Sequence, residues 1–351
     1  MDTQIMKRFR EKLSSQKQNL LDWLQNTPTD TRKINLGPEK TDSVRSRLQA
    51  LDGALAKADS ETLGLCQVCH EYVETGRLEM DFTADVCIDH FSAEQKRQLE
   101  MELELSHQLQ KALLPRELPE IAGFQLAAFS QPATIVGGDY FDFFRFRDGA
   151  QGIAIADVMG KGLPASMLVA SLQASLRILG PENVSPAIVV DRLNRLFCNN
   201  IQMIRFITLF LAHLDPGTGL LDYCNAGHNP PLIVRPEATE TTVQWLQPTG
   251  AAIGLTENFR FETGRVLLAP GDVLLLYTDG VTEAVDSKDE ELGPARLADF
   301  VRERLHLNPE ALLKQLRQFL HEFTGGTTFS DDLTIVLGKS IRTSTAHSVT
   351  H

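Results

Sequence analysis

Two sets of apolar residues near the start of the chain recur at helical spacing. They are Met6, Phe9, Leu13, Leu20 and Leu24, and then Val44, Leu48, Leu51 and Leu55. Spacings of three, four or seven place each set on one face of a helix. The polar stretch 28–38 between them has the composition of a loop. The pattern therefore predicts a helical hairpin whose apolar stripes cover each other or a second subunit.

A further helix is predicted just before the middle of the chain. Ser92 followed by Gln95 is a capping-box pattern, and Pro115 follows the end of the segment. Leucines recur along it at Leu99, Leu103, Leu109 and Leu113. We expect residues 92–115 to form a connecting helix that transmits a regulatory signal from dimer packing upstream.

Beyond Pro119 the pattern changes to apolar strands separated by turns. The predicted strands are Phe124–Phe129, Ile153–Val158, Phe206–Leu214, Leu220–Asn225, Val273–Thr278 and Leu333–Leu337. Helical patterns lie between them in pairs, at 164–179 and 186–197 and at 294–305 and 309–323. This order predicts an α/β fold of the α+β kind, in which a β-sandwich of mostly antiparallel sheets is flanked by helix pairs.

The patterns divide the chain into four parts. Residues 1–91 are predicted to be a regulatory or dimerising module, 92–115 the connecting helix and 116–340 the large domain, with a disordered tail rich in Ser and Thr at 341–351. A chain of 351 residues, 42% of them apolar, is long enough for one large domain and an appendage of this size.

Charge and hydropathy exclude several classes of protein. A formal net charge of -12, without a long run of Lys or Arg, argues against direct binding to nucleic acid or to anionic membrane surfaces. Uninterrupted apolar stretches fall short of the ~18 residues that span a bilayer, and the N-terminus lacks an apolar signal core. We therefore expect a cytoplasmic protein without a membrane segment.

Four acidic motifs lie next to apolar strands, each where a strand is expected to run into a turn. They contain Asp139, Asp157, Asp279 and the pair Asp331-Asp332. Carboxylates crowded together repel one another, so a convergent set must be protonated or must hold cations. Oxygen ligands suit two Mg²⁺ or Mn²⁺ ions, which could promote hydrolysis of a phosphate monoester without a protein nucleophile. Each motif alone is also an ordinary turn signal, and spacing does not show that the four converge.

Six motifs occur in an order that resembles a known family. They are 109–115 (LQKALLP), 132–142 (PATIVGGDYFD), 156–165 (ADVMGKGLPA), 225–231 (NAGHNPP), 276–283 (LYTDGVTE) and 330–334 (SDDLT). Together these motifs closely resemble the SpoIIE/RsbU-type branch of the PPM serine/threonine phosphatases, over about 230 residues. The resemblance implies a PPM-type β-sandwich that removes phosphate from a serine or threonine of a phosphoprotein, using two Mn²⁺ or Mg²⁺ ions.

The resemblance also implies a ligand set for these ions. Asp157 would bridge the two ions and the main-chain carbonyl of Val158 would bind one of them, while Asp279 and Asp331 would hold the other. Asp139 would lie in or next to the coordination sphere and orient bound water. The family often has Gly at the position of Val158, but only the backbone oxygen would be a ligand.

Two further residues have open roles, and one carboxylate is expected to have a supporting role. Lys161, in a Gly-rich turn, would either meet a phosphate or remain solvated, and solvation is the favoured alternative. His228 would either protonate a leaving alkoxide or hold its loop in place. Asp332 is expected to support its loop.

The cysteines suggest a second metal site. The spacing of Cys66, Cys69, Cys87 and His90 brings two ligand pairs to one tetrahedral site, which predicts one structural Zn²⁺. Unconnected buried cysteines are the alternative, and His70 is a poorer ligand candidate because it adjoins Cys69. Segments 54–69 and 77–90 resemble the DksA/TraR zinc finger, which usually has a fourth Cys where this chain has His90.

These predictions combine into a regulator-type phosphatase. The resemblance suggests that the substrate is a phosphoserine antagonist of an anti-sigma factor. The helical patterns predict a homodimer through the N-terminal and connecting helices. Two alternatives remain open. The first is a catalytically silent scaffold, which the presence of all the aspartates disfavours. The second is a regulator directed to RNA polymerase through the zinc module, although the 29–33 loop lacks an acidic pair.

Overall fold

The structure is a computed structural model, and it separates the chain into two compact units, 1–101 and 102–351. It describes residues 6–342 except 8, 12, 16, 19–20, 22–40, 161, 201–205, 238–240 and 327–328. The boundary between the units falls within α5 (Ala93–Leu113). The two units are therefore described one at a time.

The first unit has a small apolar core of its own. The described residues between 6 and 21 are helical, and they are followed by α3 (Thr41–Asp59), α4 (Thr75–Met80) and the short η1 (Ile88–His90). The buried residues that form its core are Met6, Phe9, Leu13, Leu51, Ala54, Ala58, Leu63, Cys66, Val73, Leu78, Phe82, Ala84 and Cys87. Met6, Phe9 and Leu13 of the first predicted stripe thus share one core with Leu51 of the second. Leu20, Leu24 and the predicted 28–38 loop lie outside the described residues.

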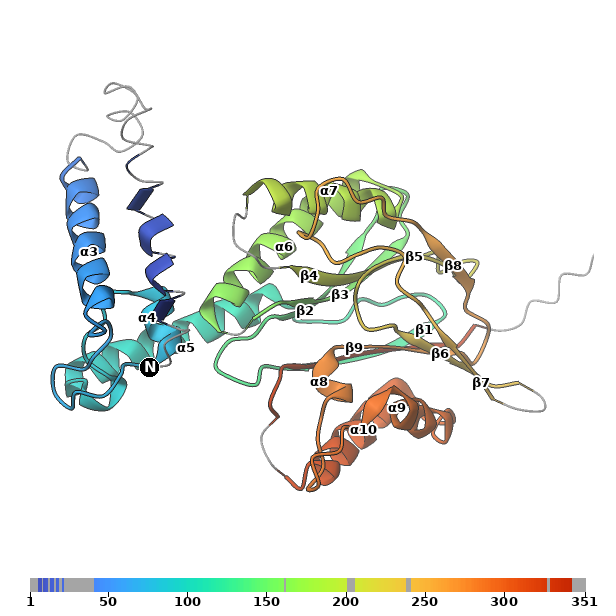
Figure 1. Ribbon diagram of the computed structural model, residues 1–351. Coiled ribbons are helices and arrows are strands. Elements are labelled where there is room, and N and C mark those ends of the chain that lie inside the picture. Colours follow the sequence, from blue (N-terminus) through green and yellow to red (C-terminus); the bar gives the residue numbers. More distant parts are fainter. Residues whose placement is uncertain are drawn as a thin grey trace, which may run out of the picture. The chain divides into compact units, whose positions relative to one another are not determined.

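The second unit contains two antiparallel five-stranded sheets (Figure 1). The first sheet has the order β1-β10-β9-β6-β7. Its strands are β1 (Phe124–Gln131), β6 (Leu232–Arg235), β7 (Thr242–Trp245), β9 (Val273–Tyr277) and β10 (Leu333–Ser340). The second sheet has the order β2-β3-β4-β5-β8. Its strands are β2 (Asp139–Arg145), β3 (Gln151–Val158), β4 (Ile207–Leu214), β5 (Leu220–Ala226) and β8 (Gly264–Leu267).

Helix pairs cover the outer faces of the two sheets. One apolar cluster joins α6 (Leu163–Glu182) and α7 (Pro186–Asn200) to the β2-β3-β4-β5-β8 sheet, and another joins α9 (Gly293–Arg302) and α10 (Pro309–Phe323) to the opposite sheet. A third cluster fills the space between the sheets. Central strands are therefore buried on both sides, as in β9, all five residues of which are buried. The predicted α+β sandwich flanked by helix pairs is confirmed.

Several short elements were not predicted. Strands β2, β6, β7 and β8, helix α4 and the single-turn helix α8 (Asp279–Thr282) had no sequence prediction. In β2 six of seven residues are buried, so it lacks the alternation that marks a half-buried strand. The strands β6, β7 and β8 have four residues each, which is too short for a clear period.

Helix α6 is apolar overall, although polar residues interrupt its sequence. Within the described part of the chain it is the one helix long and apolar enough to cross a membrane by length and composition. Its buried residues are Ala165, Ser166, Val169, Leu172, Leu176 and Gly180. In this structure they contribute to the core that α6 shares with β2 and β3.

Candidate active site and metal centre

Asp139 and Asp157 face each other across two adjacent strands. Asp139 is the first residue of β2, Asp157 is next to last in β3, and the antiparallel register pairs them directly. Side chains in such a pair have Cβ atoms about 5 Å apart. The fold thus brings together two carboxylates that are 18 positions apart in the sequence.

Asp279 and Asp331 flank two neighbouring strands of the other sheet. Asp279 follows β9 and begins α8, whereas Asp331 comes just before β10, and β9 and β10 are antiparallel neighbours. A side chain at Gly280 would overlap the backbone of Asp332, so glycine allows the two segments to approach. The prediction that every aspartate follows a strand is wrong for Asp139 and Asp331, because the end of one antiparallel strand lies beside the start of its neighbour.

A buried threonine ties the two sheets together at this edge. The Thr278 hydroxyl donates to Asp139 Oδ2 at 2.7 Å, and the backbone N–H of Thr334 donates to the Thr278 oxygen at 3.0 Å. Asp139 belongs to one sheet, whereas Thr278 and Thr334 belong to the other. The contact places all four aspartates at one edge of the sandwich.

The carboxylates influence one another's ionisation. Burial and the charges of Asp279 and Asp331 raise the pKa of Asp157 to about 7. Burial and the charge of Asp157 raise the pKa of Asp139 well above its usual value. The raised pKa values reflect repulsion between the carboxylates, and a bound cation would relieve that repulsion.

Three oxygens converge on the space beside Gly138. A Cβ atom built on this glycine would lie 2.5 Å from the carbonyl oxygen of Val158, 3.1 Å from that of Gly160 and 3.4 Å from Asp157 Oδ1. Glycine leaves that space open. Two carbonyl oxygens and a carboxylate oxygen are hard ligands of the kind that Mg²⁺ and Mn²⁺ prefer, so the residues present fit such an ion.

Asp332 holds the loop that leads into β2. Its Oδ1 accepts from the N–H of Ala133 at 2.7 Å, and its Oδ2 accepts from the N–H of Gly138 at 2.6 Å and of Asp139 at 3.4 Å. These bonds occupy both oxygens with backbone donors. Asp332 therefore positions Asp139, in the supporting role expected for it.

Side chains of helix α5 also form hydrogen bonds with this loop. The buried side chain of Gln110 donates to the Gly137 carbonyl at 2.6 Å and accepts from the Gly137 N–H at 2.9 Å. His107 Nδ1 donates to the Ile135 carbonyl at 2.7 Å. Gln110 and Thr278 were not predicted as site residues, although both lie within the motifs that resemble the phosphatase family, because neither is charged or hydrophobic.

His228 is buried and forms two hydrogen bonds between strands. Its Nε2 donates to the Tyr277 carbonyl at 3.1 Å, and its Nδ1 accepts from the Thr208 hydroxyl at 2.9 Å. Burial lowers its pKa to about 4, so the ring is neutral near pH 7. This geometry favours the structural alternative over proton transfer to a leaving group. Lys161 lies outside the described residues.

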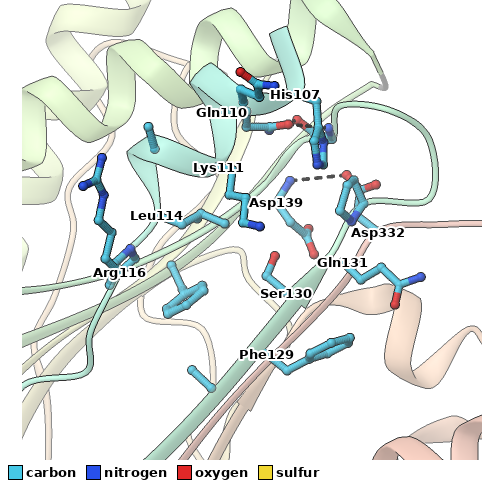
Figure 2. Close-up of a pocket in the computed structure, with 17 residues that line it drawn as sticks. His107, Gln110, Lys111, Leu114, Arg116, Phe129, Ser130, Gln131, Asp139 and Asp332 are labelled. Carbon is cyan, nitrogen blue, oxygen red and sulfur yellow. Dashed lines mark hydrogen bonds between the residues drawn. The ribbon is translucent and has the colours of Figure 1, made fainter. Parts of the chain in front are cut away.

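A pocket of about 800 Å³ opens beside Asp139. Figure 2 shows side chains from the C-terminal half of α5 on one side and from β1 on the other. Asp139 and Asp332 line it, whereas Asp157, Asp279 and Asp331 do not. The carboxylate cluster therefore lies at one margin of this pocket.

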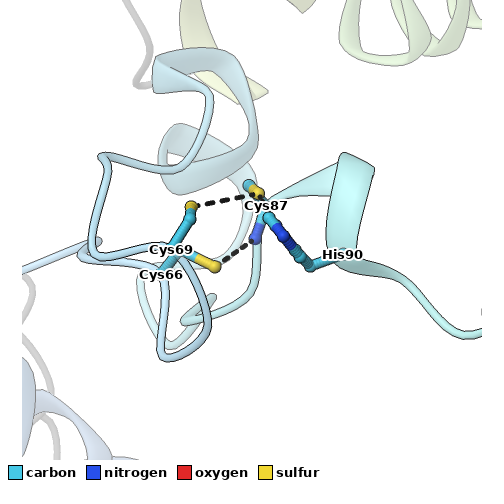
Figure 3. Close-up of side chains that lie close together, drawn as sticks. All are labelled: Cys66, Cys69, Cys87 and His90. Carbon is cyan, nitrogen blue, oxygen red and sulfur yellow. Dashed lines mark hydrogen bonds between the residues drawn. The ribbon is translucent and has the colours of Figure 1, made fainter.

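In the first unit the predicted Cys/His cluster is assembled (Figure 3). One ligating atom from each of Cys66, Cys69, Cys87 and His90 lies within 4.8 Å of all the others. The sulfurs of Cys69 and Cys87 are 3.8 Å apart, and His90 Nδ1 is 3.0 Å from the Cys87 sulfur. Zn–S bonds of about 2.3 Å in a tetrahedron separate two sulfurs by ~3.8 Å, so the set fits Zn²⁺. His70 is not part of this cluster.

Backbone amides also favour a thiolate at this cluster. The N–H groups of Val68 and Cys87 each approach the Cys66 sulfur to 3.4 Å. Hydrogen bonding from the backbone of Cys69 and Cys87 lowers the pKa of Cys66 to about 6. Zn²⁺ binds thiolates rather than thiols, so this local geometry suits metal binding.

Known proteins are similar to this chain in sequence and in fold. The SiaA-PP2C domain of Pseudomonas aeruginosa superposes with a TM-score of 0.62 at 23% identity, covering 71% of this chain and 99% of that domain. Protein IcfG of Synechocystis sp. is 30% identical over 67% of this chain and 41% of its own length. The phosphoserine phosphatase RsbU of Bacillus subtilis is 26% identical over 75% of this chain and 79% of its own. The chain thus spans less than half of IcfG.

The fold is that of PP2C-type phosphatases. Residues 147–339, more than half of the chain, match the family model of stage II sporulation protein E, and the chain belongs to this SpoIIE family. The matched range contains Asp157, Asp279 and Asp331, whereas Asp139 precedes it.

Proposed function

We propose that the chain is a metal-dependent phosphatase that hydrolyses phosphoserine or phosphothreonine in a protein substrate. The observation that carries the proposal is the convergence of four aspartates from two sheets beside the oxygen-lined space at Gly138. At neutral pH, bound cations would relieve the repulsion within such a set and keep its carboxylates ionised. Family membership and the name of RsbU support phosphoserine as the residue that is dephosphorylated.

Asp157 and the Val158 carbonyl would hold one Mg²⁺ or Mn²⁺, and Asp157 would share a second with Asp279 and Asp331. When bound, two such cations offset the charge of the phosphoryl group under attack and make water a stronger nucleophile at neutral pH. Asp139, whose Oδ2 accepts from Thr278, would orient the attacking water through its remaining lone pairs. The residues of this site supply charge and orientation rather than a covalent nucleophile.

The first unit would be a regulatory module with one structural Zn²⁺ on Cys66, Cys69, Cys87 and His90. A closed set of four ligands leaves no position for a substrate, which supports a structural rather than catalytic metal. We propose the domain limits 1–91, 92–115, 116–340 and 341–351, a homodimer formed through the N-terminal and connecting helices, and a cytoplasmic location without direct nucleic-acid or membrane binding. A phosphoprotein of a bacterial signalling pathway, such as an anti-sigma-factor antagonist, would be the substrate.

Hydrolysis of p-nitrophenyl phosphate and of a phosphoserine protein tests the proposal. Phosphate release should require Mn²⁺ or Mg²⁺, stop in EDTA and fall at least 100-fold in Asp157→Asn and Asp279→Asn. Isothermal titration with Mn²⁺ should show weaker binding in both variants, which is a measurement independent of turnover. Wild-type protein that binds Mn²⁺ but releases no phosphate from either substrate would favour the silent scaffold.

A further inference from the structure

The pocket beside Asp139 is lined by two positively charged side chains that are not part of the carboxylate cluster. Lys111 and Arg116 line its α5 side, and Figure 2 shows the Lys111 side chain pointing into it. Neither residue forms an ion pair with a carboxylate within the part of the chain that the structure describes. Although the protein has a net charge of -12, it presents cationic groups beside the aspartate cluster.

The opposite wall suits a peptide rather than a small ion. Phe129, Ser130 and Gln131 at the end of β1 line it. The guanidinium carbon of Arg317 lies 3.7 Å from the centroid of the Phe129 ring, and this contact stabilises the position of the ring. An aromatic ring, a hydroxyl and an amide can contact both the backbone and the side chains of an extended segment.

The position of the cationic wall is fixed relative to Asp139. Gln110, adjacent to Lys111, forms two hydrogen bonds with Gly137, two residues before Asp139 in the chain. His107, one turn earlier, bonds the same loop. These bonds hold the part of α5 that carries Lys111 beside the loop that leads to Asp139.

We propose that this pocket, which we call the α5–β1 pocket, binds the segment next to the phosphorylated residue and prefers substrates with carboxylates there. This inference rests on the proposed phosphatase function and names the class of its substrate. With the phosphoryl group at the aspartates, a neighbouring residue ~3.5 Å along an extended chain enters the α5–β1 pocket. A carboxylate on that residue meets Lys111 or Arg116 in charge-assisted contacts. The Lys111 and Arg116 side chains thus favour acidic sequences, which the net negative charge of the protein otherwise repels.

Two matched phosphoserine peptides test the preference. They are identical except that one has Asp and the other Asn at the two positions on each side of the phosphoserine. In wild type with Mn²⁺, kcat/KM for the Asp peptide should exceed that for the Asn peptide about tenfold. In Lys111→Glu and Arg116→Glu the ratio should fall to about one or below, whereas Lys314→Glu, an equal charge change at an exposed position of α10, should keep the wild-type ratio.

Two results would overturn the proposal: a wild-type ratio near one, or a ratio unchanged in both pocket variants, whether activity is kept or is lost equally for both peptides. An equal loss would place Lys111 on the phosphoryl group itself. Failure of the phosphatase function is distinguishable, because it would abolish metal-dependent turnover of p-nitrophenyl phosphate as well. In that case fluorescence anisotropy with labelled phosphonate analogues of the two peptides measures the same preference without turnover, and equal affinities would reject the pocket.

Discussion

The Thr278 hydroxyl donates to Asp139 Oδ2 at 2.7 Å, and this bond joins the facing sheets where the aspartates meet. Both side chains are buried, at 0% and 6% exposure. A buried carboxylate with a fixed donor keeps one orientation, so its other oxygen has a defined direction. The site is thus organised by an uncharged residue as well as by its carboxylates.

Replacing Thr278 should therefore disturb metal binding and stability together. In Thr278→Val the shape is kept, but Asp139 loses its donor and the Thr334 N–H loses its acceptor. Leaving a buried donor or acceptor unsatisfied costs about 1–3 kcal/mol. Urea unfolding should show a loss of that size, and calorimetric titration should show weaker Mn²⁺ binding. Thr278→Ser retains the hydroxyl and should recover most of the affinity; equal affinities in Val, Ser and wild type would contradict the assigned role.

The raised pKa of Asp157 predicts how stability depends on pH. Burial and the neighbouring carboxylates raise it to about 7, against about 3.9 in an unfolded chain. The folded state binds this proton more tightly, so the stabilisation is complete below about pH 4 and is lost as pH rises through about 7. We expect the metal-free protein to become less stable from about pH 5 to about pH 7, by at most about 1.4 kcal/mol per pH unit from this group.

Chemical unfolding in EDTA at several pH values measures this dependence. Asp157→Asn should flatten it, and saturating Mn²⁺ should remove it because the bound cation favours the ionised form. Asp286→Asn is the matched control, since backbone N–H groups of Glu290 and Lys288 lower the pKa of Asp286 and keep it ionised over this range. A pH dependence equally steep in Asp157→Asn would show that another group is responsible.

His228 should be required for structure and not for proton transfer. It links Thr208, which is paired with Asp157 in the β3–β4 register, to Tyr277, two residues before Asp279. Because burial lowers its pKa to about 4, it stays neutral at the pH of the reaction. His228→Ala leaves the Tyr277 carbonyl and the Thr208 hydroxyl without this partner and should lose about 2–4 kcal/mol of stability.

Comparison with His228→Gln separates the two roles of His228. The Gln amide can still donate from a position close to Nε2, so this variant should be more stable than His228→Ala. Its kcat should follow pH with the same shape as in wild type. A limb near neutral pH that disappears in His228→Gln would instead identify His228 as a general acid.

The sandwich was predictable because most of its strands are long and bounded by turn residues. Six of the ten strands in the described part of the chain, and both helix pairs, were predicted near their observed limits. Strand β2 was not, since burial on both faces erases its period and Asp139 looks like the end of a turn. Burial on both faces becomes visible only when the second sheet and the helices are placed.

The aspartates were identifiable as residue types but not as a cluster. Sequence spacing does not reveal that Asp139 pairs with Asp157 across a strand register. It also does not reveal that Gln110 is the buried residue of α5 while Leu109 is 60% exposed. Polar residues that bind backbone groups depend on the loop that they hold, and that loop is positioned by the tertiary fold.

The Cys/His cluster should bind one Zn²⁺ per chain. Its four ligand atoms lie within 4.8 Å of one another, and two backbone N–H groups point at the Cys66 sulfur. Elemental analysis of purified protein should give one zinc. Co²⁺ exchanged into the site should show the ligand-field bands of a tetrahedral thiolate complex, and these should be lost or shifted in Cys69→Ser and His90→Ala. Metal binding supplies folding free energy, so chelation should unfold the first unit.

Two matched variants decide whether the cobalt spectrum comes from this cluster. Cys198→Ser removes a half-buried thiol in α7 and should leave zinc content and the cobalt bands unchanged. His70→Ala tests the competing ligand, and because His70 stands outside the four-residue cluster it should bind one zinc like wild type. Loss of zinc in His70→Ala but not in His90→Ala would reassign the fourth ligand. Absence of zinc from wild type, with no uptake of Co²⁺, would show that the cysteines are simply part of the apolar core of this unit.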